Sequence, residues 1–179
     1  QTRFPTRWSE QLEMLAKYGI DVLPFTEYAG SDSKIDGLGR EKRCKTLEGG
    51  DTYTHIVWSE KYNADVTDPD TLEDFKKVLD CAIIRYKDTA AFVGVWLRTR
   101  PSHLPMSFSD RCLTLFSEQA NAGQPVTREQ LKADTVLYEK YRQWWFLQRR
   151  EFLIAIRDYL REQGVDGAEV LFTADSTEP

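Results

Sequence analysis

The chain has 179 residues, a hydrophobic fraction of 41% and a formal net charge of −5, with a sequence pI near 5.2. An acidic chain binds nucleic-acid phosphates and anionic membrane surfaces poorly, so we expect neither as a partner. No stretch approaches the ~18 consecutive apolar residues of a membrane-spanning helix, and the length suits one domain with its own core.

The N-terminal third predicts one helix–strand unit followed by an irregular region. Apolar residues at helical spacing predict a helix over 7–18, and a strand over 20–25 follows after a glycine. Residues 29–52 are rich in glycine, serine and aspartate, which predicts a long loop of the kind that often carries function. A short strand is predicted over 53–58.

The central part predicts a second unit. Asp68-Pro69-Asp70 has the capping chemistry of a helix start, and a helix over 70–86 leads into a strand over 92–97. Because this strand is a continuous apolar run, we expect it to be buried on both faces, as in a parallel sheet.

The C-terminal part predicts a third unit. Ser109 can cap a short helix, Thr127 to Gln130 fits a capping box, and a long helix over 134–163 precedes a strand over 168–173. Each strand thus follows a helix closely, which predicts an α/β fold with parallel strands and right-handed crossovers.

We expect residues 1–179 to form a single α/β segment. Three or four strands are few for a sheet covered on both faces, and the chain starts at a helix and stops just after a strand. Both features favour part of a larger TIM-type (β/α)8 barrel. A complete small α/β domain is the alternative.

In such folds ligands bind at the carboxyl ends of the strands. The carboxylates predicted there are Glu27, Asp175 and Glu178, and two of them on opposite sides of a sugar ring would serve as acid and base or nucleophile. Loop carboxylates that cap backbone amides are the simpler alternative.

Five further residues at these strand ends are candidates for substrate binding. Arg98 and Arg100 alternate along one strand exit, so both face the same way and could bind an anion, or form a structural ion pair with Glu27. His103 is held between two prolines, which suits a site, although the pattern slightly favours a histidine that is only hydrogen-bonded. Tyr28 and Trp58 are candidates for stacking on sugar.

Other chemistry finds little support. Trp144 and Trp145 lie at helical spacing, which predicts core packing, and Arg149 and Arg150 predict a solvated or ion-paired helix face. The aspartates before the second helix are spaced too irregularly for a calcium loop. GxSxG, HExxH and P-loop motifs do not occur, so we predict no metal or other cofactor.

The three cysteines, Cys44, Cys81 and Cys112, form no CxxC pair. Their odd number excludes a complete disulfide framework. One disulfide with one thiol is possible, and three buried thiols are the favoured interpretation.

Several segments resemble the middle of bacterial (β/α)8-barrel glycoside hydrolases of the broad beta-galactosidase-like group. These are Val22 to Gly30, Asn63 to Pro69, Val93 to Leu97 with its Arg-Pro exit, and Val170 to Thr173. The resemblance implies a hydrolase with a carbohydrate substrate, completed by the remainder of the same barrel, and it alone favours a secreted or periplasmic protein. The acid/base glutamate of that group usually follows an asparagine at the end of the fourth strand, whereas the exit here reads Arg98-Thr99-Arg100-Pro101. No catalytic residue is therefore carried over from the group.

Three functions follow as hypotheses. The first is a glycoside hydrolase acting on an oligo- or polysaccharide, whose acidic groups would explain the arginine pair. The second is a non-catalytic carbohydrate-binding or structural barrel segment in which Arg98 and Arg100 pair with Glu27. The third is a barrel enzyme acting on a small anionic metabolite.

Overall fold

A computed structural model describes residues 5–26, 43–52, 63–97 and 104–172 of the chain. Three parallel strands form one sheet in the order β1-β2-β3, where β1 is Phe25–Thr26, β2 is Gly94–Leu97 and β3 is Glu169–Phe172. The predicted α/β fold with parallel strands is therefore confirmed. Strands that are neighbours in sequence are also neighbours in the sheet.

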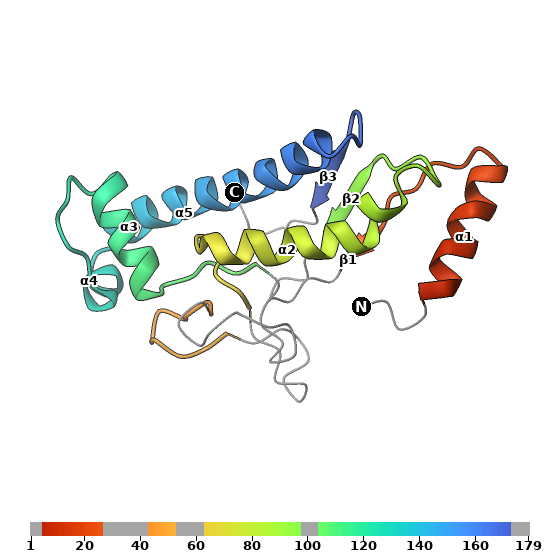
Figure 1. Ribbon diagram of the computed structural model, residues 1–179. Coiled ribbons are helices and arrows are strands. Elements are labelled where there is room, and N and C mark those ends of the chain that lie inside the picture. The colour runs from red at the N-terminus through yellow and green to blue at the C-terminus, as the bar shows by residue number, and fades with distance from the viewer. Residues whose placement is uncertain (1–4, 27–42, 53–62, 98–103, 173–179) are drawn as a thin grey trace.

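Five α-helices lie in the described part of the chain (Figure 1). α2 connects toward β2, and a longer passage through three helices leads from β2 to β3. The helices are α1 (Pro5–Lys17), α2 (Pro69–Ala82), α3 (Asp110–Ala120), α4 (Arg128–Ala133) and α5 (Thr135–Glu162), with a 3₁₀ turn over Ile84–Tyr86. None of the described helices combines the length and apolar character that crossing a membrane requires.

The helices begin where local side-chain chemistry caps them. Asp68 accepts a hydrogen bond from the Asp70 amide at the start of α2, and Ser109 accepts one from the Cys112 amide at the start of α3. Thr127 and Gln130 form the reciprocal capping box of α4. These predicted caps are confirmed. They could be predicted from the sequence because each depends on residues three or fewer positions apart.

Two predicted elements have different bounds from those expected. The first strand is shorter than 20–25, and Val22 makes only an isolated parallel bridge to Phe92 before β1 begins. The helix expected over 70–86 ends at Ala82, and Ile83 separates it from the 3₁₀ turn. The strand predicted over 53–58 lies outside the described residues.

The sheet and its helices share one apolar core. Phe75 of α2 packs on Phe152 of α5 with ring centroids 6.3 Å apart, and the Tyr159 hydroxyl of α5 donates to Asp80 of α2 at 2.5 Å. Val95, fully buried on β2, belongs to the same core. α2 and α5 therefore lie side by side over one face of the sheet (Figure 1).

β2 and β3 approach each other closely at Gly94. Its φ of +140° is open to glycine alone, and a Cβ atom there would lie 1.8 Å from the carbonyl oxygen of Glu169. Glycine at this position therefore permits the first pair of the β2–β3 register, Gly94 with Glu169.

Candidate functional site

The three strands end in one row of the sheet. Thr26 pairs in register with Leu97, and Leu97 pairs with Phe172. These are the last residues of β1, β2 and β3, so the chain leaves all three strands at the same edge. Parallel α/β sheets bind ligands at this carboxyl edge.

The row just before this edge is apolar and half-exposed. Phe25, Trp96 and Leu171 are partners across the three strands, and they are 45%, 41% and 49% exposed. Val95 and Leu97, which alternate with Trp96 along β2, are buried under the helices. We call the face that carries Phe25, Trp96 and Leu171 the uncovered face, in the sense that none of the described helices covers it. The expectation that the apolar run 92–97 is buried on both faces is therefore wrong, because the described helices cover only one face.

Every residue predicted to act at this edge lies outside the described residues. The predicted acid–base carboxylates and the predicted substrate-binding residues fall within 27–42, 53–62, 98–103 and 173–179. They are Glu27, Tyr28, Trp58, Arg98, Arg100, His103, Asp175 and Glu178. The structure places the three strand ends that all of these residues except Trp58 follow in the sequence.

Arg149 supplies a positive charge behind the carboxyl end of β3. It is only 9% exposed, and its guanidinium lies 4.7 Å from the ring centroids of both Phe146 and Phe172 and 5.6 Å from that of Trp145. The prediction that Arg149 lies on a solvated or ion-paired helix face did not anticipate this packing, because the contact with Phe172 joins residues far apart in sequence. Trp144 and Trp145 are buried, which confirms their predicted role in the core.

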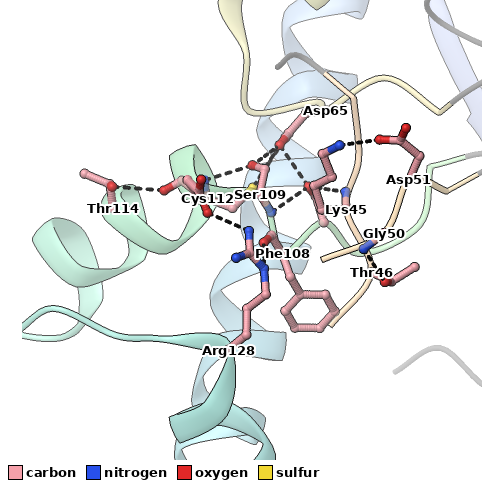
Figure 2. Close-up of polar contacts among 12 residues, drawn as sticks. Lys45, Thr46, Gly50, Asp51, Asp65, Phe108, Ser109, Cys112, Thr114 and Arg128 are labelled. Atoms are coloured by element: carbon pink, nitrogen blue, oxygen red, sulfur yellow. Dashed lines mark hydrogen bonds and ion pairs between the residues drawn. The ribbon is translucent and has the colours of Figure 1, made fainter. Parts of the chain in front are cut away.

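A cluster of hydroxyl and thiol side chains surrounds Asp65, which is 1% exposed. The Ser109 hydroxyl donates to its carboxylate at 2.5 Å and the Ser107 hydroxyl at 2.9 Å. Thr67 donates from its hydroxyl at 2.7 Å and from its amide at 3.0 Å, and the Cys112 thiol lies 3.2 Å away. We call this group the Asp65 cluster; Asp65, Ser109 and Cys112 are labelled in Figure 2.

The Asp65 cluster joins segments that are distant in sequence. Tyr141 of α5 donates its hydroxyl to the Ser107 carbonyl at 2.5 Å, and the Lys45 amide donates to the Ser107 hydroxyl at 3.4 Å. Arg128, at the start of α4, donates to the Phe108 carbonyl at 2.8 Å (Figure 2). The segment Leu104–Ser109, which carries the chain from the exit of β2 to α3, is therefore fixed on several sides.

The thiols and the phenol around Asp65 are held in their neutral forms. Burial, followed by the nearby Asp65 carboxylate, raises the pKa of Cys112 to about 12, and the same two causes raise the pKa of Cys44. Burial also raises the pKa of Tyr141. Neutral thiols are poor nucleophiles, and the Asp65 oxygens are occupied by donors. The cluster therefore orders the chain beside the carboxyl edge and offers no acid–base pair.

The sequence did not single out this cluster. Asp65 is one of several irregularly spaced aspartates in the sequence, and the predicted burial of Cys112 does not identify its partner. The spacing Asp65-Val66-Thr67 is a local signal that could have indicated a turn closed by the aspartate side chain. The expectation of three buried thiols is wrong for Cys81, which is exposed.

Two further features limit the chemistry of the described part. It contains no group of three histidine, cysteine or acidic side chains placed to hold a metal ion. A shallow hollow of about 510 Å³ lies between α3 and the start of α4, where Asp110 on its rim is paired with Arg128 at 2.6 Å.

Comparisons with protein-family models, with curated proteins and with solved structures find no match.

Proposed function

We propose that the chain is part of a (β/α)8-barrel glycoside hydrolase whose chemistry takes place at the carboxyl edge of the sheet. The observation that carries the proposal is the arrangement of β1, β2 and β3 in sequential order, with their ends in one row and the described helices on one face. The resemblance of several segments to barrel glycoside hydrolases supplies the substrate class.

Sequential strand order favours a barrel over a doubly wound sheet. Right-handed crossovers that always step in the same direction place every helix on the same face. A doubly wound sheet reverses its strand order and so receives helices on both faces. In a closed barrel the helix-free face becomes the interior, and a half-exposed apolar row such as that containing Trp96 suits this position.

Side-chain alternation supports a role for the residues that follow β1 and β2. Glu27 stands two residues after Phe25, and Arg98 stands two residues after Trp96. Alternate residues of an extended strand face the same way. Continued extension of these strands by two residues would therefore bring Glu27 and Arg98 to the uncovered face, above the apolar row.

The proposed chemistry needs two carboxylates across a sugar ring. Asp175 stands four residues after Leu171, so extension of β3 would bring it to the same face as Glu27. One of the two would protonate the leaving oxygen, and the other would act as base or nucleophile. Glu178 is the alternative to Asp175. Arg98 and Arg100 would bind the carboxylate of an acidic sugar by paired hydrogen bonds.

Hydrolysis assays on the protein in its natural length test this proposal. The probes are oligosaccharides of neutral hexoses and of uronic acids, and the readout is release of reducing ends. We expect hydrolysis of at least one uronic-acid substrate, and a loss of at least about 100-fold in kcat for Asp175→Asn, in keeping with the usual contribution of an acid or base. Thermal shifts with simple anions and none with sugars would instead favour an enzyme acting on a small anionic metabolite.

The strand register also favours a second candidate, a non-catalytic barrel segment. Because Thr26 pairs with Leu97, the next residues along the two strands are Glu27 and Arg98. An ion pair between them would tie β1 to β2 and occupy the carboxylate. A double-mutant cycle with Glu27→Gln and Arg98→Met, read as unfolding free energy, tests this candidate. Coupling of more than about 1 kcal/mol together with absent hydrolysis would favour it.

A further inference from the structure

We infer that the hollow between α3 and the start of α4 binds a small organic ammonium ion that carries an apolar chain. Residues of α3 line one side of it, and residues of the segment 123–129 line the other; we call it the α3–α4 hollow. Figure 1 shows α3 and α4 at the end of α5 that is remote from the sheet. The hollow shares no residue with the strand ends, so the inference does not depend on the proposed hydrolase.

Hydrogen bonds fix both sides of the α3–α4 hollow. The Ser117 hydroxyl donates to the Leu113 carbonyl at 2.7 Å and accepts from the Val126 amide at 3.1 Å. The Gly123 amide donates to the Ser117 carbonyl at 2.8 Å, so the connection after α3 is tied back to that helix. A site with fixed walls loses little freedom on binding, and its volume of about 510 Å³ lies in the range of small-molecule pockets.

Part of the lining of the α3–α4 hollow is apolar. Leu113 and Val126 both line it and are each only 7% exposed, and Pro125 beside them is exposed. An apolar chain placed against these side chains would remove hydrocarbon from water on both partners, which favours binding. The ligand that suits the hollow therefore has an apolar part.

The ionised groups around the α3–α4 hollow favour a cation. Three carboxylates and one guanidinium line it, which leaves a formal charge of −2. Asp110 and Arg128 offset each other, because they form an ion pair at 2.6 Å. Glu118 and Glu129 carry the excess, and no basic side chain in the described part of the chain forms an ion pair with either of them.

Glu129 keeps its negative charge at neutral pH. Hydrogen bonds from its own amide and from the Thr127 hydroxyl, with Lys132 nearby, hold the pKa of its carboxyl below the usual range. The described residues offer no group of side chains placed to hold a metal ion, so a bare metal ion does not suit the hollow. An ammonium group needs no such coordination and pairs with single carboxylates.

Three ligands of equal length and different charge test the inference on the wild-type protein. They are hexylamine, 1-hexanol and hexanoate, titrated at pH 7 and constant ionic strength, where the amine is protonated like a lysine side chain. The readout is the ¹H–¹⁵N NMR spectrum. We expect hexylamine to shift the amide resonances of Gly123 and Val126, to bind at least about fivefold more tightly than hexanol, and hexanoate not to saturate.

Substitution of the two glutamates separates the charge from the apolar contact. Glu118→Gln and Glu129→Gln should each weaken the Kd of hexylamine about two- to fivefold, as expected for a half-exposed ion pair, and leave that of hexanol unchanged. The matched control is Glu162→Gln, because Glu162 is exposed at the far end of α5. It should leave both Kd values unchanged.

Several outcomes would overturn the inference. These are equal Kd values for hexylamine and hexanol, shifts that avoid the residues of the hollow, and the same loss in all three glutamine variants. Binding of a lysine-containing peptide without binding of hexylamine would also overturn it, because the occupant would then be a protein. None of these outcomes bears on hydrolysis at the carboxyl edge, so the two proposals stand or fall separately.

Discussion

The Ser109 hydroxyl lies 2.5 Å from the Asp65 carboxylate, although 44 residues separate them in the chain. The same serine caps α3 by accepting from the Cys112 amide at 3.1 Å. The Ser109 side chain thus caps the start of α3 and also donates a hydrogen bond to a buried carboxylate. Because Ser107 bonds the same carboxylate, the chain that follows β2 is fixed to the start of α2 through Asp65.

Replacing Asp65 should destabilise the protein strongly. Asp65→Ala leaves the hydroxyls of Ser107 and Ser109 without their acceptor in a buried position, and each unsatisfied group costs about 1–3 kcal/mol. We expect a loss of about 3–5 kcal/mol in unfolding free energy, measured by urea denaturation. Asp65→Asn should cost less, because its amide oxygen still accepts. The matched control is Asp68→Ala, which removes a helix cap and should cost about 1 kcal/mol. Equal losses for the Asp65 and Asp68 variants would contradict the account of the cluster.

Gly94→Ala should prevent the pairing of β2 with β3. The added Cβ would lie 1.8 Å from the Glu169 carbonyl oxygen, and relief requires movement of backbone. We expect a loss of more than about 3 kcal/mol, or failure to fold, since strain at a special backbone position is among the few large mutational effects. Gly19→Ala is the control, because Gly19 also has positive φ but no atom within 4 Å of the added Cβ. It should cost about 1–2 kcal/mol. Circular dichroism and urea denaturation of both variants give the comparison.

Stability should fall in alkali because of the buried thiols. The pKa of Cys112 is about 12 in the folded protein against an ordinary value of 9.0, so its contribution is complete below pH 9 and is lost as the pH rises from 9 to about 12. The slope should be about 1.4 kcal/mol per pH unit for this thiol, and Cys44 acts in the same direction. Urea denaturation at pH 8 and pH 10 should show a smaller decline for Cys112→Ala than for wild type. An identical decline in the two proteins would show that Cys112 does not keep its proton.

Thiol labelling should distinguish the three cysteines. Cys81 is exposed, whereas Cys44 and Cys112 are buried. We expect a disulfide reagent such as 5,5′-dithiobis(2-nitrobenzoic acid) to modify one thiol quickly in the native protein and the other two only in denaturant. Cys81→Ser should abolish the fast phase. Rapid modification of two or three thiols at neutral pH would mean that the Asp65 cluster opens readily.

Local chemistry explains which parts of the fold could be predicted from the sequence. The caps at Asp68, Ser109 and Thr127 depend on nearby residues, and the long apolar pattern of α5 depends on helical spacing alone. Parallel strands followed from the alternation of helices and strands. The bounds of β1 were not predicted, because whether a residue pairs in a sheet depends on its neighbouring strand.

Tertiary contacts explain what was missed. Asp65 and Cys112 meet across 47 residues, and no local pattern announces their contact. The exposure of Trp96 does not follow from the sequence, because a continuous apolar run predicts burial on both faces, whereas the described helices cover only one. The structure describes the carboxyl edge of the sheet, where the sequence predicts the site. The predicted site residues themselves lie outside the described residues.

Whether carboxylates at the carboxyl edge hydrolyse a sugar can be decided by comparing substitutions of two glutamates. Glu27 follows the last residue of β1, whereas Glu169 begins β3 at the opposite edge and pairs with Arg161 at 2.6 Å. On the uronic-acid oligosaccharides, the account predicts that Glu27→Gln lowers kcat at least about 100-fold and that Glu169→Gln changes it less than twofold. Equal activity of the two variants, or absence of hydrolysis by the wild-type protein on every sugar tested, would contradict it.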